Sequence, residues 1–167
     1  QSASEHNIQT PYKALLDGSA LGVIDPLIER ILEEQVLDAD RLREIVFWFT
    51  TKAPDREPVK FSMALLGLIR GHDDSDIFLT LGRHDEFTLY SAVALSNRDN
   101  YGEESLWKLA IAAEGWGRIS TVERLAETSS PEIKDWLLRE GFKNSVMYEY
   151  LACICARAGD LHLALER

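Results

Sequence analysis

Apolar residues recur along this chain at intervals of about 45 residues, and this recurrence constrains the fold more than any other feature. Three series of apolar positions share separations of 45 or 46 residues. They are Leu42, Phe87 and Ile133; Ile45, Tyr90 and Trp136; and Phe61, Leu106 and Leu151. Recurrence on this scale is the signature of an array in which each structural unit packs against the next.

Helix signals occur along the whole chain. A capping side chain precedes proline at Thr10, Asp25 and Ser130, and we expect Gly18, Gly71, Gly141 and Gly159 to end helices. No segment alternates strictly between apolar and polar residues, so we expect no strands. The apolar stripes predict a short helix near 11–17 and helices near 25–35, 40–51, 57–70, 74–82, 85–97, 103–114, 118–127, 131–140 and 144–158.

Nine main helices and the 45-residue recurrence together predict three groups of three helices. A repeat of this length is typical of HEAT and armadillo proteins, and residues 25–158 resemble that class. The resemblance implies an all-α fold, a right-handed α-α superhelix, with repeats at about 25–70, 74–114 and 118–158 in one domain over 1–167. The chain does not clearly match the Pro, Asp and Arg pattern of well-marked HEAT repeats, which leaves the repeat subtype open.

A second resemblance is confined to the C-terminal part of the chain. Its motifs are LWKL at 106–109, GWGRI at 115–119, VERL at 122–125, WLLR at 136–139 and MYEYL at 147–151. These motifs are similar to those of a group of poorly characterised bacterial helical proteins, some of which carry the label limonene hydroxylase. Hydroxylation requires haem, flavin or non-haem iron. No residues for these groups are evident, so we expect no cofactor and no such activity.

The chain is strongly acidic, with a formal net charge of -10 over 167 residues. Such a surface repels phosphate backbones and anionic headgroups, so we expect neither nucleic acid nor a membrane as partner. The excess of acidic residues has two interpretations: the residues form a solvent-exposed face, or they line a groove that binds a basic peptide. The lone pair Cys153 and Cys155 indicates a reducing, cytoplasmic compartment, and their spacing directs the two thiols differently.

Two polar junctions between predicted helices are candidate sites. The segment 72–76 offers one histidine and three aspartates, but its spacing fits no common metal loop, so we interpret it as a polar helix start. His84 beside Asp85 and Glu86 is a candidate acid–base group, whereas the simpler interpretation makes Asp85 a helix cap. We therefore expect no metal site and no catalytic residues.

The junction 115–118 has a more site-like composition, and we predict a kink there between the second and third groups. Trp116 lies between two glycines and precedes Arg118. It is either a plug between repeats or an exposed contact residue, and an exposed Trp–Arg pair would be a binding hot spot. Trp107 and Trp136 fall on helix stripes and are expected in the core.

The leading hypothesis is a non-catalytic scaffold that binds a protein or peptide. In an armadillo-like order, the third helix of each group lines the concave side, and its polar positions are Lys60, Ser105, Lys108, Asn144 and Tyr148. One alternative is an enzyme or small-molecule-binding domain, with His84, Trp116, Tyr148 and Cys153 around a pocket between repeats. Another is a structural segment of a longer protein, because the apolar pattern at 161–165 runs to the last residues.

Overall fold

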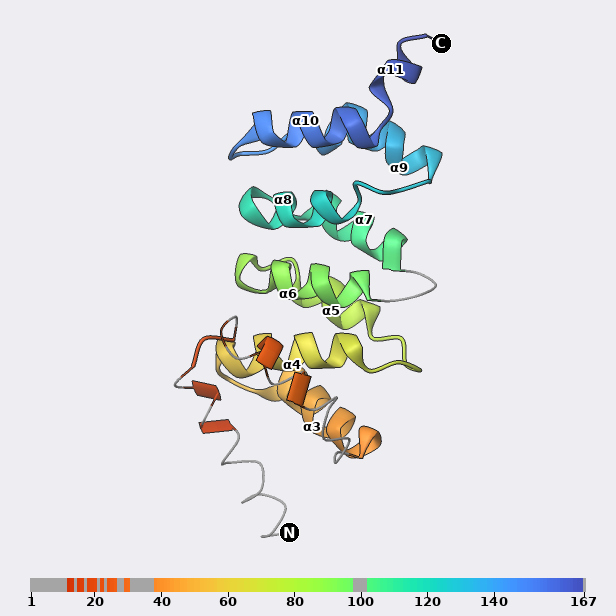
Figure 1. Cartoon of the computed structure of the whole chain (residues 1–167). Helices are drawn as coiled ribbons and strands as arrows, with labels where there is room; N and C mark the ends of the chain where they lie inside the picture. The colour runs from red at the N-terminus through yellow and green to blue at the C-terminus, as the bar shows by residue number, and fades with distance from the viewer. Residues whose placement is uncertain are drawn as a thin grey trace. The chain divides into compact units, whose positions relative to one another are not determined.

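The computed structural model describes residues 38–97 and 102–166, together with positions 12, 13, 15, 16, 18–20, 22, 24–26, 29 and 30. Every regular element in these residues is a helix, as predicted (Figure 1). By its internal contacts the chain divides into two compact units, residues 1–72 and 73–167. Within the described part, no helix has the length and apolar character needed to cross a bilayer.

The first unit contains α3 (Ala39–Lys52) and α4 (Arg56–Leu68), which pack against each other. Asp38 begins α3 by accepting hydrogen bonds from the N–H groups of Asp40 and Arg41. Apolar residues on two sides of α4 are buried, namely Val59, Met63 and Leu66 on one side and Phe61 and Leu65 on the other, whereas Leu68 is exposed. A helix that is apolar on both sides needs neighbours on both sides, and its burial agrees with that expectation. Positions 12, 13, 15 and 16 of the helix predicted near 11–17 are described and helical, whereas most of the helix predicted near 25–35 lies outside the described residues.

The second unit contains a longer series of helices. They are α5 (Ser75–Leu81), α6 (Asp85–Ser96), α7 (Gly102–Ala112), α8 (Gly115–Arg124), α9 (Pro131–Trp136), the π-helix η1 (Leu137–Gly141), α10 (Tyr148–Ala158) and α11 (Leu161–Ala164). In Figure 1 they form successive pairs, α5 with α6, α7 with α8, and α9–η1 with α10. Contacts of α6 with α8 and of α8 with α10 join each pair to the next.

The core of the second unit is built from the inward stripes of these helices. Phe78, Leu95, Leu109, Leu137 and Leu151 have no exposed surface. Burying each such side chain stabilises the fold by about 1.5–3 kcal/mol relative to leaving it in water. The contacts leave the boundaries of the predicted three-helix groups open, because α8 packs against α6 and α7 as well as α10.

The glycines at the start of α8 correct the prediction of a kink. The helix begins at Gly115, three residues earlier than expected, with Glu114 as its N-cap residue. Gly115 has φ +58°, a left-handed conformation that glycine adopts without strain. A Cβ at Gly117 would lie 2.8 Å from Thr88 Cγ2, so this glycine allows α6 and α8 to approach closely. Trp116 therefore lies in the first turn of a helix and not on a loop.

Other predicted helix ends also shift. Gly159 is the C-cap residue of α10, as expected, whereas Gly141 lies inside η1. A Cβ at Gly141 would lie 3.0 Å from Leu137 Cδ2 and 3.2 Å from Cys155 Sγ, so a larger residue there would require these neighbours to shift by a few tenths of an ångström. Ser130 caps α9 as predicted, but His84 and not Asp85 caps α6, because His84 Nδ1 accepts a hydrogen bond from the N–H of Glu86.

Candidate binding surface at the start of α8 and α10

The side chain of Asn144 joins the start of α8 to the loop before α10. Its Oδ1 accepts a hydrogen bond from Gly115 N at 2.8 Å, and its Nδ2 donates to Gly115 O at 3.0 Å. The same Nδ2 donates to Val146 O at 2.7 Å. The predicted helix over 144–158 consequently begins only at Tyr148, because residues 144–147 form this hydrogen-bonded loop. Trp116 and Met147 each follow a residue that Asn144 holds in place.

Large apolar side chains are exposed around this junction. Trp116 is 66% exposed and Tyr148 is 58% exposed, and Met147 and Tyr150 are also exposed. We call these four residues the Trp116 surface. Met147 has φ +46°, an uncommon conformation for a side chain of its size, and the Asn144 bond to Val146 lies directly before it. The exposure of Trp116 shows that the buried plug is wrong, while its role as a contact residue stays a prediction.

Arg118 corrects the expectation of an exposed Trp–Arg pair, because it is only 6% exposed. Its Nη1 donates to the carbonyls of Ala110 and Ala113, and its Nη2 donates to that of Glu140 at 2.8 Å. These carbonyls lie at the C-terminal ends of α7 and η1, where the helix dipole favours a cation. The guanidinium also lies over the Trp136 ring, 5.3 Å from its centroid. Arg118 thus joins α7, α8 and η1 from within.

An open cavity borders the same junction. It has a volume of about 480 Å³ and lies between the ends of α7 and η1 and the start of α8. Its lining consists of Ile111, Glu114, Arg118, Trp136, Glu140, Lys143 and Asn144. We call it the Glu114 cavity. Trp107 and Trp136, both expected in the core, are half-buried, and their rings meet edge to face.

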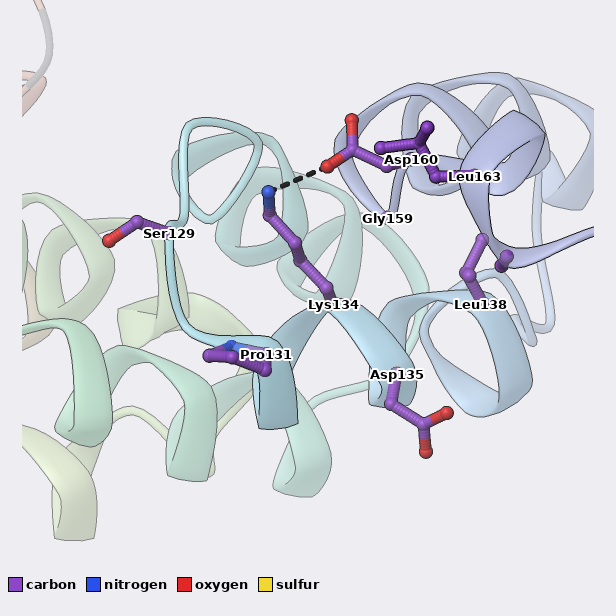
Figure 2. Close-up of a pocket in the computed structure, with 9 residues that line it drawn as sticks. Ser129, Pro131, Lys134, Asp135, Leu138, Gly159, Asp160 and Leu163 are labelled. Atoms are coloured by element: carbon purple, nitrogen blue, oxygen red, sulfur yellow. Dashed lines mark hydrogen bonds and ion pairs between the residues drawn. The ribbon is translucent and has the colours of Figure 1, made fainter. Parts of the chain in front are cut away.

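A smaller cavity of about 240 Å³ lies between α9 and the α10–α11 turn (Figure 2). Lys134 Nζ and Asp160 Oδ2 form an ion pair across it at 2.7 Å, shown as the dashed line. The Lys134 ammonium lowers the pKa of the Asp160 carboxyl through this bond. Asp135, also in the lining, is paired with Arg139. Because the charged side chains of this lining are already paired with each other or with Arg139, the smaller cavity is the weaker candidate for a binding site.

The remaining predicted binding residues take part in local contacts. Lys60 belongs to the first unit, where its half-buried ammonium pairs with Glu57 at 2.9 Å. Lys108 is exposed on α7 and pairs with Glu104 at 2.7 Å, while Ser105 on α7 is buried. Of the six binding residues predicted from the sequence, Trp116, Arg118, Asn144 and Tyr148 lie near the starts of α8 and α10, and Arg118 is buried there.

The candidate catalytic and metal residues are not assembled into a site. His84 caps α6, and Cys153 is exposed on α10, with Arg157 Nη2 3.9 Å from its Sγ. Cys155 is buried, and desolvation raises the pKa of its thiol to about 11, so it stays protonated. The residues that the structure describes contain no group of three potential metal ligands, the segment 72–76 included.

Carboxylates surround the Trp116 surface. Glu123 on α8 accepts a hydrogen bond from Tyr150 Oη at 2.7 Å, and this bond raises the pKa of Tyr150. Glu149 raises the pKa of Tyr148 in the same way. Glu114 lies beside Gly115 and is exposed. Exposed carboxylates therefore accompany the exposed aromatic side chains of α8 and α10.

Three residues of the site were missed from the sequence. The sequence predicts that Met147 and Tyr150 lie within a helix over 144–158 and that Glu114 ends a helix over 103–114, and neither prediction marks them as contact residues. The Asn144 side chain, which displaces the start of α10, could have been found only from the contact it makes 29 residues away. An Asn shortly before a helical stripe is a weak signal of such a loop.

Comparison with known proteins assigns the chain to no family: no family model, no curated protein and no solved structure matches it.

Proposed function

We propose that this chain is a non-catalytic helical scaffold that binds a protein or peptide partner through the Trp116 surface. The observation that carries the proposal is the exposure of Trp116, Met147, Tyr148 and Tyr150 at a junction held by Asn144. Trp and Tyr dominate the binding energy of protein interfaces, and Met adapts to partners of irregular shape. Single exposed apolar residues are common on any surface, but here four of them lie close in sequence to the two backbone segments that Asn144 joins.

Preorganisation is the second support for this proposal. Binding costs free energy for each loop and side chain that must be ordered. The Asn144 hydrogen bonds to Gly115 and Val146 hold the start of α8 and the preceding loop of α10 before a partner arrives. Tyr150 is further held by Glu123. The partner therefore meets aromatic groups whose backbone is already fixed.

Charge favours a basic partner. Glu114, Glu123 and Glu149 are exposed around the Trp116 surface, and the chain carries a net charge of -10. A peptide that combines aliphatic or aromatic side chains with Lys or Arg complements both the centre and the border of this surface. The same charge argues against nucleic acid and anionic lipid as partners.

The wider architecture we propose is a HEAT/armadillo-like superhelix in the cytoplasm. Its support is the 45-residue recurrence of apolar residues and, within the second unit, the packing of each helix pair against the next. Two free cysteines, one of them exposed, fit a reducing compartment. Solenoids of this class generally bind partners along an extended surface.

A peptide selection tests the proposed function. A random peptide library is selected against the whole chain, and the affinity of the selected peptides is measured by isothermal titration calorimetry. The Trp116→Ala variant should bind at least about 30-fold more weakly, which corresponds to a hot-spot loss of about 2 kcal/mol. The selected sequences should contain both Lys or Arg and large apolar residues.

Trp48→Ala is the matched control, because Trp48 is an exposed tryptophan in the first unit, on α3. It should leave the affinity within about twofold of the wild type. Circular dichroism of both variants checks that each remains folded. Peptides that bind the two variants equally well would place the partner surface elsewhere and overturn the proposal.

A further inference from the structure

The Glu114 cavity has an apolar wall and a charged rim. Ile111, which is 52% exposed, and the half-buried ring of Trp136 form the apolar part. Glu114, Glu140 and Lys143 supply charges at the rim, together with the side chain of Asn144. Its volume of about 480 Å³ falls within the range of small-ligand pockets. Asn144 also holds Gly115, so this cavity is continuous with the junction that carries Trp116.

The charges of the cavity are not all paired. Glu140 pairs with Lys143 at 2.7 Å. The Arg118 guanidinium is surrounded by the carbonyls of α7 and η1 and by the Trp136 ring. Glu114 has no cation at ion-pair distance among the residues that the structure describes, and its carboxylate does not cap α8. The lining is neutral as a whole, because Arg118 and Lys143 balance Glu114 and Glu140. Glu114 is nevertheless its one carboxylate without an ion-pair partner among the described residues, and it lies beside an apolar wall.

We propose that the Glu114 cavity receives a Lys or Arg side chain of the partner. The methylene stem of that side chain packs against Ile111 and Trp136, and its cationic head donates hydrogen bonds to the Glu114 carboxylate. Lys and Arg are suited to such a site because they bury an apolar stem while the charge stays near water. This inference rests on the proposed function and specifies the basic residue of the peptide.

An anion bound to Arg118 is the opposite reading of the same cavity. Arg118 Nε is buried and has no hydrogen-bond partner among the described residues. The same burial, however, prevents a ligand from reaching Nε unless the helices around it move apart. Glu114 would also repel an anion at the rim, and the Lys143 ammonium there is already paired with Glu140. The observations favour the cation.

Titrations with small probes, followed by NMR on the whole ¹⁵N-labelled chain, test the inference. The probes are N-acetyl-lysine amide, the uncharged N-acetyl-norleucine amide and the anionic N-acetyl-glutamate amide. The lysine probe should shift the Trp136 indole N–H and the Asn144 side-chain amide saturably. The norleucine probe should bind roughly fivefold more weakly, the size expected of a partly exposed ion pair. The glutamate probe should shift neither signal.

Two variants test whether the Glu114 carboxylate causes the preference for the lysine probe. Glu114→Gln keeps the size of the side chain, removes the carboxylate and should abolish the preference for lysine over norleucine. Glu103→Gln is the matched control, because Glu103 is an exposed glutamate on α7 that does not line the cavity. An unchanged lysine preference in Glu114→Gln overturns the inference. Equal binding of lysine and norleucine, no shift with lysine, or binding of the glutamate probe overturns it as well.

Failure of this inference can be distinguished from failure of the proposed function. Trp116→Ala removes peptide binding under the proposed function but leaves the lysine probe in the cavity, because Trp116 is not part of its lining. If peptides depend on Trp116 while the lysine probe does not bind, the cavity assignment alone is wrong. If the lysine probe binds while no peptide depends on Trp116, the proposed function alone is wrong.

Discussion

At the junction of α7, α8 and η1, some residues are buried and hold the helices together, whereas others are exposed to solvent. Arg118 and Trp116 are two positions apart in the sequence, yet one is 6% and the other 66% exposed. Both types are common at binding hot spots, so residue type alone predicts a contact role for each. The carbonyls at the ends of α7 and η1 determine that Arg118 turns inward.

Replacing Arg118 should destabilise the fold. Arg118→Met removes the donors to Ala110, Ala113 and Glu140 and leaves their carbonyls in a buried region without those partners. We expect a loss of about 3 kcal/mol in the free energy of unfolding, measured by urea titration. Arg139→Met, which breaks the exposed pair with Asp135, should cost less than about 0.5 kcal/mol. Equal losses would show that Arg118 has no structural role.

Gly117 is a second residue whose role follows from close contact. Gly117→Ala places a Cβ 2.8 Å from Thr88 Cγ2, which should push α8 away from α6. We expect a loss of about 1–3 kcal/mol in stability, seen as a lower melting temperature. Thr88→Ser in the same chain removes the clashing methyl group, keeps the hydroxyl bonded to Gly82 O, and should recover part of the loss. No recovery would mean that Cγ2 is not the cause and would leave Thr88 Cβ and Oγ1, which lie 2.9 and 3.0 Å from the same position.

At the scale of elements, side chains that reach across the second unit decide where helices begin and how they are joined. Asn144 ties the loop before α10 to the start of α8, so α10 begins later than the sequence predicts. A second link between the two helices is the hydrogen bond that Tyr150 on α10 donates to Glu123 on α8. Lys134 joins α9 to the turn between α10 and α11. Intrinsic helix propensity does not contain this information, because the bonded groups lie 26 to 29 residues apart.

Asn144→Ala should loosen the start of α8 without unfolding the chain. The Gly115 N–H loses its acceptor, and the loop before Tyr148 loses two of its anchors. Hydrogen exchange at the Gly115 amide should become at least about tenfold faster. The affinity for the selected peptides should fall because the loop must now be ordered on binding. Unchanged exchange at Gly115 would exclude Asn144 as the anchor.

The Lys134–Asp160 pair predicts a pH dependence. The pKa of Asp160 is lowered in the folded chain, so its contribution to stability is present above its unfolded pKa of about 4. That contribution is lost as the pH falls through the lower folded value. Asp160→Asn should therefore lower stability at pH 7 and reduce the dependence of unfolding free energy on pH below about 4. Parallel curves for wild type and variant would contradict this linkage.

At the scale of the whole molecule, the net charge of -10 governs long-range attraction, and two compact units organise the chain. The Trp116 surface and the Glu114 cavity lie entirely within the second unit. The charge is spread over both, so it attracts a cationic partner in general but does not select one. Selection has to come from the apolar side chains and the Glu114 carboxylate.

Binding of the selected basic peptides should weaken with salt. Raising NaCl from about 50 to 500 mM shortens the screening length severalfold, and it should lower the association rate more than it raises the dissociation rate. Stopped-flow fluorescence measures both rates. A peptide in which Lys and Arg are replaced by norleucine serves as the control and should show little salt dependence. Equal salt effects on both peptides would remove electrostatics from the proposal.

The sequence by itself determined the helical class and most helix positions, because spacing of apolar residues and capping side chains act within one or two turns. It also singled out Trp116, Asn144 and Tyr148. Only the tertiary structure decided that Arg118 is buried, that Gly115 and Gly117 begin α8, and that α10 starts at Tyr148. Each of these depends on a partner more than 20 residues away, and local pattern carries no information about such contacts.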